Sequence, residues 1–348
     1  MMNLCRAFLL TLAALTPIAA QSLSVKWEEL TAGDFVQAIE KAQGTCLLPF
    51  GILEKHGPHL PLGNDLINVR YAALHGAEQE YVVVYPEYYF GQIFEARHEP
   101  GTVAYSASLQ LELLHETTSE MARNGCKKII IVNGHGGNNS LLPFFAQSQM
   151  ASSRDYVVYI YQPAGHPPGR PPMKSAFDQH AGEAETSLTM ISRPDLVHLD
   201  RAASESGADQ KRQDLPAGVY TGIWWYAKFP EHYAGDAAAA NRALGEFDMK
   251  AWAAGVANVI RAVKADQVTL RLQNEFFEKS RKTFGHPAVA PTGPHALHPR
   301  MGRFAGGSIC SLRPFESSSS TSVVRFPVRY NPPALRTATP AARRAEYS

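Results

Sequence analysis

The sequence predicts an α/β fold in which helices cover both faces of a parallel sheet. Two observations support this prediction. Between residues 45 and 161, short apolar segments alternate with longer segments of helical periodicity, the pattern of repeated strand–helix–strand units. The first short segment, TCLLPFGIL, is apolar almost throughout, as expected of a strand that is buried on both faces.

Four segments predict strands because they are short, apolar and rich in β-branched or aromatic residues. In chain order they are TCLLPFGIL from Thr45, YVVVYPEYY from Tyr81, CKKIIIVNG from Cys126, and residues 156–161.

Five segments predict helices between and after these strands. They lie at 65–79, 108–123, 141–150, 182–191 and 241–265. In the first helix, apolar residues from Leu66 to Ala77 recur on one stripe. The second helix has Ser106 or Ser108 as its N-terminal cap.

The bulk composition excludes some classes of partner. The 348 residues are enough for one large domain or two ordinary ones. Because 33 basic residues balance 32 acidic ones, no charge field for nucleic acid or a membrane surface is expected. No G-x-S-x-G, H-E-x-x-H, Walker or G-x-G-x-x-G motif is present, so those hydrolase and nucleotide-binding classes are not indicated.

The two ends of the chain differ from its middle. Arg6, an apolar run at 7–15 and small residues ending at Ala20 predict a signal peptide at 1–20, so we expect a periplasmic or secreted protein. An N-terminal core helix is the alternative. Residues 285–348 are rich in Pro, Ser and Arg and predict a disordered tail, which leaves 21–284 as the folded domain.

Three cysteines remain after removal of the predicted signal peptide. They are Cys46, Cys126 and Cys310. So few cysteines, odd in number, do not form a disulfide framework. We interpret Cys46 and Cys126 as buried thiols, although an exported protein could also pair them.

Ionisable side chains follow two of the predicted strands. Glu54 and His56 come directly after the first strand, and spacing by two places them on one face of an extended chain. Asp65 lies where the next helix begins, and His135 follows the third strand in IVNGHGGN. The carboxyl ends of parallel strands form the usual ligand-binding edge, so these four groups are expected to converge there.

Such a set of ligands suits zinc, manganese or iron. Asp65 is the natural bridge between two divalent ions, which together could generate hydroxide and polarise an amide carbonyl. A single histidine near a turn is more often a structural residue than a ligand, so the prediction depends on the whole set.

A third element, FDQHAGEAETS, adds His180 and Glu185 just before and within a predicted helix. Glu185 is a candidate ligand, and His180 is a candidate proton carrier. Glu183 has a simpler explanation, since a carboxylate in the first helical turn stabilises the helix dipole. His59 is a candidate for packing, for supporting a metal ligand or for binding metal itself, and His98 is a candidate for substrate binding or a structural turn.

These motifs together resemble the creatininase family of metal-dependent amidohydrolases. The resemblance rests on GILEKHGPHLPLGND, HEPGT, IVNGHGGN and HAGEAETS in that order, and extends to AGDAAAANRALGE from Ala234. It covers roughly residues 27–266. It implies a three-layer α/β/α fold with a mostly parallel sheet, a two-metal centre and a homo-oligomer, commonly a hexamer.

The resemblance also implies residue roles. Glu54 and His56 would bind different ions, Asp65 would bridge them, and His135 would bind the ion shared with Glu54. His180 and Glu185 match the family's catalytic His and Glu. Two departures make creatinine a doubtful substrate. Gly137 stands where creatininase proper has a glutamate ligand, so Glu185 is expected to replace it, and Phe177 is the only aromatic residue just before His180.

The sequence therefore predicts a metal-dependent hydrolase of a small non-peptide or cyclic amide, with metal-bound hydroxide attacking the carbonyl. Members with the NGHGGN form resemble a branch that includes formamide hydrolases and a peptide-trimming enzyme, and these activities are the alternatives. A non-catalytic metal- or ligand-binding protein on the same fold is the other alternative.

Overall fold

The structure is a computed structural model that describes residues 23–163, 165 and 167–283. The predicted signal peptide at 1–20 and the predicted tail at 285–348 lie outside these residues. Within the described part of the chain, no helix is both long and apolar enough to cross a bilayer.

Four parallel strands form the central sheet in the order β2-β1-β3-β4. They are β1 (Thr45–Phe50), β2 (Val83–Val84), β3 (Lys128–Asn133) and β4 (Val157–Tyr161). Strand β2 is much shorter than the predicted strand at 81–89. Tyr85 still donates its backbone amide to the Leu47 carbonyl, but beyond it the pairing with β1 is reduced to an isolated bridge between Phe50 and Tyr88.

Eight α-helices surround the sheet in the described residues. They are α1 (Ala32–Lys41), α2 (Asn64–Gln79), α3 (Ala107–Arg123), α4 (Asn138–Ser148), α5 (Glu183–Ser192), α6 (Trp224–Lys228), α7 (Arg242–Ala265) and α8 (Thr269–Arg281). Short 3-10 helices lie at Trp27–Glu29, Phe94–Ala96, Gln149–Ala151, Pro194–Leu196, Leu199–Ser204 and Ala237–Ala239. Three of the α-helices, α1, α6 and α8, were not predicted from the sequence.

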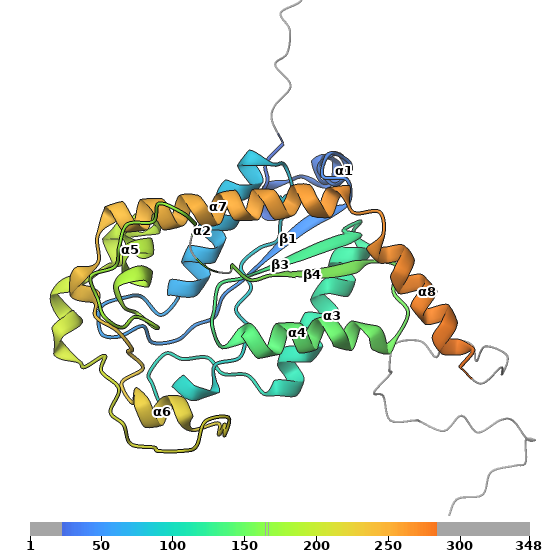
Figure 1. Cartoon of the computed structure of the whole chain (residues 1–348). Helices are drawn as coiled ribbons and strands as arrows, with labels where there is room; N and C mark the ends of the chain where they lie inside the picture. The colour runs from blue at the N-terminus through green and yellow to red at the C-terminus, as the bar shows by residue number, and fades with distance from the viewer. Residues whose placement is uncertain (1–22, 164, 166, 284–348) are drawn as a thin grey trace, which may run out of the picture. The chain divides into compact units, whose positions relative to one another are not determined.

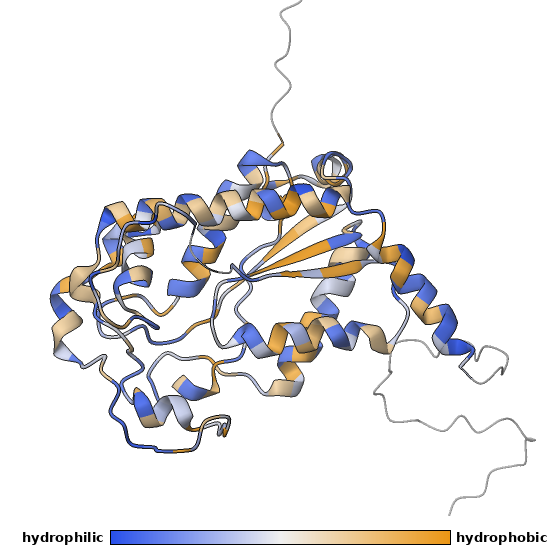
Figure 2. Ribbon diagram, viewed as in Figure 1, coloured by the Kyte–Doolittle hydropathy of each residue, from blue (hydrophilic) through white to orange (hydrophobic). Residues whose placement is uncertain are grey.

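The alternating side chains of the strands build a core on each face of the sheet. Leu48 and Ile131 pack on the side of α1, α3 and α4, whereas Leu47 and Ile130 pack on the side of α2 and α7. Figure 1 shows α7 on one side of the strands and α4 on the other. Figure 2 shows the apolar colour concentrated on the strands. The predicted three-layer α/β/α fold is therefore confirmed.

Helix α5 is held in place by a close crossing with α7. A Cβ atom at Gly245 of α7 would lie 2.0 Å from the carbonyl oxygen of Ser187 on α5, so only glycine permits this approach. The crossing matters for function because α5 carries Glu185.

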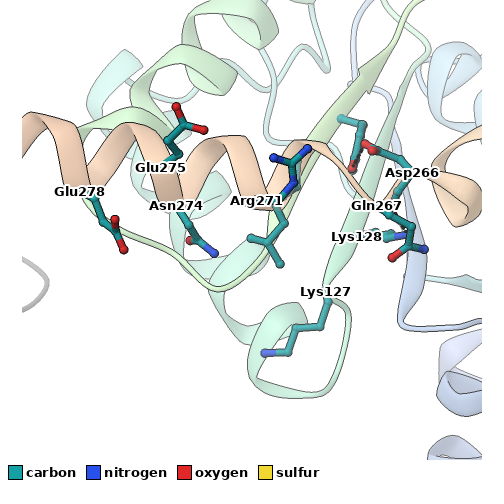
Figure 3. A pocket seen from close by; sticks show the side chains of 11 residues that line it. Lys127, Lys128, Asp266, Gln267, Arg271, Asn274, Glu275 and Glu278 are labelled. Atoms are coloured by element: carbon teal, nitrogen blue, oxygen red, sulfur yellow. Dashed lines mark hydrogen bonds between the residues drawn. The ribbon is translucent and has the colours of Figure 1, made fainter.

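The amino ends of β3 and β4 anchor helices α7 and α8. Lys128 Nζ donates to the carbonyl oxygens of Val263, Lys264 and Asp266 at 2.7–2.9 Å and so caps α7. The Asp266 carboxylate accepts from the Val268 amide at 2.7 Å and from the Tyr159 hydroxyl at 2.8 Å. A surface cavity of about 510 Å³ lies beside this junction (Figure 3), at the amino ends of β3 and β4.

A disulfide joins Cys46 on β1 to Cys126, which lies just before β3. Both residues are fully buried, as predicted. The interpretation of the pair as free thiols was wrong, and the alternative, that the two cysteines are paired, is correct.

Candidate metal centre

The carboxyl edge of the sheet gathers the four ionisable residues that follow the strands. Register pairs Phe50 with Asn133, so the chain leaves β1 and β3 at neighbouring points. Beyond β1 come Glu54 and His56, both fully buried. His135 follows β3, and Asp65 enters from the first turn of α2. The structure thus brings together side chains that are up to 81 positions apart.

One group of metal-binding donors consists of Glu54, Asp65 and His135. His135 Nδ1 lies 2.9 Å from Glu54 Oε1 and 2.8 Å from Asp65 Oδ2. Neither of these two carboxylate oxygens has a hydrogen bond of good geometry among the described residues. Buried oxygens in this state are costly unless a cation neutralises them.

A second group consists of His56, Asp65 and Glu185, whose donor atoms lie within 4.8 Å of one another. His56 Nε2 is 3.0 Å from Asp65 Oδ1 and 3.9 Å from Glu185 Oε2. The two oxygens of Asp65 therefore face different groups, which is the arrangement of a bridging carboxylate.

The histidine orientations test whether a metal fits these groups. His56 Nδ1 faces the Glu54 carbonyl oxygen at 3.3 Å, and His135 Nε2 faces the Gln92 carbonyl oxygen at 3.0 Å. A carbonyl only accepts, so each of these nitrogens carries a proton, and the second ring nitrogen points at carboxylates. This is the usual setting of a metal-binding histidine, because only a proton or metal ion can lie between a lone pair and a carboxylate.

The pKa shifts in the metal-free protein agree with this geometry. Burial would lower the pKa of His56, but Asp65 and Glu54 outweigh it and raise that pKa to about 9. His135 behaves in the same way, with a pKa well above its usual value because Glu54 and Asp65 offset its burial. Protons therefore occupy these nitrogens when no metal is bound.

His180 differs from these two histidines. Its Nε2 faces the Lys55 carbonyl oxygen at 2.9 Å, which leaves the lone pair on Nδ1, 3.8 Å from Glu185 Oε2. Burial lowers the pKa of His180 to about 3, so the ring is neutral. Burial also raises the pKa of Glu185, to about 7, and one of its oxygens accepts from the Ala181 amide at 2.6 Å.

Gly137 has no room for a ligand side chain. A Cβ atom there would lie 2.4 Å from His135 Nε2 and 2.9 Å from the Gln92 carbonyl oxygen. The contact that orients His135 thus occupies the space of a side chain at 137, and Glu185 supplies the carboxylate that is grouped with His56 and Asp65.

The remaining predicted residues lie outside both donor groups. His59 Nε2 bonds to the Thr186 hydroxyl at 2.9 Å. His98 Nε2 lies 2.7 Å from the Pro230 carbonyl oxygen, and this histidine does not line the cavity above the donors. Glu183 accepts from the amides of Lys174 and Ser175 and so holds the preceding loop.

A cavity of about 380 Å³ opens above the donors. Besides Glu54, His135, His180 and Glu185, its lining includes Glu95, Gln179, Trp224 and Trp225. Trp225 meets His180 edge-on, with ring centroids 5.9 Å apart. The two tryptophans, distant along the chain, thus supply the aromatic wall that the residues before His180 lack.

The sequence analysis missed His232. This residue is 2% exposed, and its Nε2 makes a short hydrogen bond to Glu54 Oε2. The only signal was its place in EHYAGD, directly before the AGDAAAANRALGE motif. No spacing rule connects it to Glu54, which lies 178 positions earlier.

Comparison with known proteins finds relatives of this chain. The family model Creatininase, described as creatinine amidohydrolase, matches residues 28–260. Creatinine amidohydrolase of Pseudomonas putida is 26% identical over 205 residues, which cover 54% of this chain and 79% of that protein. A solved mutant creatininase described as "Zn-Zn type" has a TM-score of 0.56 at 24% identity, covering 70% of this chain and all of that one.

A second kind of relative acts on a peptide. Mycofactocin precursor peptide peptidase of Mycolicibacterium smegmatis is 35% identical over 162 residues, which cover 44% of this chain and 60% of that protein. The match therefore spans less than two thirds of that relative.

Proposed function

The chain belongs to the creatininase family, and from this premise we propose that it is a metal-dependent amidohydrolase acting on a C–N bond of a small non-peptide or cyclic amide. One observation carries the proposal. Two groups of donors, all buried except the half-buried Glu185, meet at a shared Asp65, with one oxygen of that carboxylate facing each group.

Two divalent ions fit the donors. Glu54, Asp65 and His135 would hold the first, and His56, Asp65 and Glu185 the second. Mixed imidazole and carboxylate ligands suit zinc, manganese or iron. When bound, such a pair of ions polarises a carbonyl group and lowers the pKa of water.

His180 is our candidate for proton transfer. Its neutral ring presents the Nδ1 lone pair beside the donors, while the Lys55 carbonyl fixes the opposite nitrogen. The ring can accept a proton from the attacking nucleophile at Nδ1 and return it to the leaving nitrogen. Its contact with Trp225 keeps the ring in this orientation.

The cavity supports a small substrate. About 380 Å³ is at the lower end of the range for small-molecule sites, and two tryptophans give it flat walls. The 35% identical peptidase supports a second candidate, in which the end of a peptide enters the same cavity. A formamide hydrolase is the third activity consistent with this donor set.

We also propose that the protein is exported to the periplasm or secreted. The buried Cys46–Cys126 disulfide supports this, because disulfides persist in oxidising compartments. A homo-oligomer, with six chains as in much of the family, is proposed too. Exposed apolar side chains at Val219, Tyr220 and Ile223 support it, and light scattering on the purified protein tests it.

The test of function is an assay of metal-loaded and chelator-stripped protein against three panels: small cyclic amides, N-formyl compounds and short peptides. We expect turnover in the first panel that disappears after stripping and returns when zinc or manganese is added. His180→Ala should bind the ions normally and lose turnover. Activity that persists after stripping contradicts the proposal, and ion binding without turnover in any panel favours the non-catalytic alternative.

A further inference from the structure

His232 belongs to none of the motifs that define the metal centre, yet it contacts a ligand. Its Nε2 bonds to Glu54 Oε2, the oxygen that does not face His135. Its backbone has a φ of +49°, which is uncommon for a residue other than glycine and has to be held by its surroundings. The amides of His232 and Gly57 supply part of that support, bonding to the carbonyls of Phe229 and His232 respectively.

The second ring nitrogen of His232 has an unusual partner. Trp225 Nε1 lies 2.9 Å from His232 Nδ1, and an indole N–H can only donate. Nδ1 therefore accepts, and the ring proton lies on Nε2, where it is donated to Glu54. His56, His135 and His180 have the opposite arrangement. In each of them the protonated nitrogen faces a backbone carbonyl oxygen, and the other nitrogen faces the donors.

The site thus contains histidines of two kinds. Three have a lone pair directed towards the donors, as metal ligands or a proton carrier require. With the ions bound, His232 would be the one histidine of these four that directs an N–H bond at a ligand, because Trp225 can only donate to its other nitrogen.

We propose that His232 is a positioning residue, which holds Glu54 with Oε1 directed at the first metal ion, and that Trp225 sets the tautomer that allows it. This inference rests on the metal centre proposed above. It also joins two parts of the molecule, because Trp225 is a wall of the substrate cavity. A change at Trp225 would then alter the position of Glu54 through the two hydrogen bonds of His232.

The first test measures zinc affinity by competition with a chelator. Outer partners of metal ligands typically contribute about 10–100-fold in affinity, so His232→Leu should weaken one of the two ions by about that factor. His232→Gln should retain the affinity, because its amide can donate to Glu54 and accept from Trp225. Equal affinity in wild type and His232→Leu, or equal losses in Leu and Gln variants, would overturn the inference.

A matched pair of variants tests the role of Trp225. Trp225→Phe keeps an aromatic ring but removes the donor, and it should weaken the same ion. Trp224→Phe changes the neighbouring tryptophan of the same cavity, which makes no hydrogen bond to His232, and it should leave zinc affinity unchanged. An equal loss in both variants would assign the effect to the cavity wall and contradict the inference.

Nitrogen-15 NMR of the wild-type protein tests the tautomer without any risk of misfolding. We expect His232 in the Nε2–H form, with its signal assigned by its loss in His232→Gln. The Nδ1–H form would overturn the inference. If wild-type protein binds no zinc, the proposed function fails, whereas the tautomer in metal-free protein still tests the hydrogen-bond chain separately.

Discussion

Breaking the Cys46–Cys126 disulfide should cost much of the stability of the domain. The bond closes a loop with a sequence separation of 80 between strands β1 and β3. For a loop of this length, the chain-entropy relation gives about 4.5 kcal/mol at 25 °C, which is a large share of a typical folding free energy. Reduction should therefore lower the denaturant midpoint strongly.

The assay is urea unfolding of metal-stripped protein, with and without a reductant, so that the reductant cannot act through bound metal. The double variant Cys46→Ala, Cys126→Ala is the matched control. It should be less stable than oxidised wild type and indifferent to the reductant. If reduction leaves the wild-type midpoint unchanged although free thiols appear, the loop does not constrain the unfolded chain as argued.

Three further predictions follow from the contacts above. Metal analysis should show that Asp65→Asn loses both ions, whereas Glu185→Gln retains one. One retained ion in each variant would contradict the role of Asp65 as a bridge between the two ions. His56 and His135 are protonated in metal-free protein at neutral pH, so zinc affinity should rise as the pH increases from 6 to about 9. Calorimetry in two buffers should detect the released protons, and a zinc affinity that does not change with pH would contradict the assignment of these histidines as ligands. Asp266→Ala removes an acceptor at the start of α8 and should cost about 1 kcal/mol at pH 7. Hydrogen bonds lower the pKa of Asp266, so its stabilisation is present above about pH 4 and fades below it; a pH-independent difference in thermal midpoint would contradict this.

The layers of the fold were predictable because the central strands β1 and β3 are buried on both faces. Leu47 and Leu48 are adjacent in sequence but lie in different cores. Because both faces of such a strand must be apolar, the strand appears in the sequence as a continuous run of apolar residues. The second strand was predicted too long, because its composition is that of a strand while its pairing with β1 beyond Tyr85 is reduced to an isolated bridge at Tyr88. Helix α8 was missed, since most of its residues are polar and it buries only Phe277.

The donors near strand ends were predictable for a similar reason. Topology alone brings the residues after β1 and β3 to one edge, so Glu54, His56 and His135 could be grouped without a structure. Long-range partners follow no such rule. Trp225 lies on the short helix α6 and His232 follows that helix, and only coordinates place them beside Glu54.

The most direct test of the account is metal analysis of the purified full chain, grown with adequate zinc and manganese and then dialysed. We expect two divalent ions per chain in wild type and the loss of one in Glu185→Gln. A wild-type protein that retains no ion, and gains none on titration with zinc or manganese, would contradict the proposal that these donors form a two-metal centre.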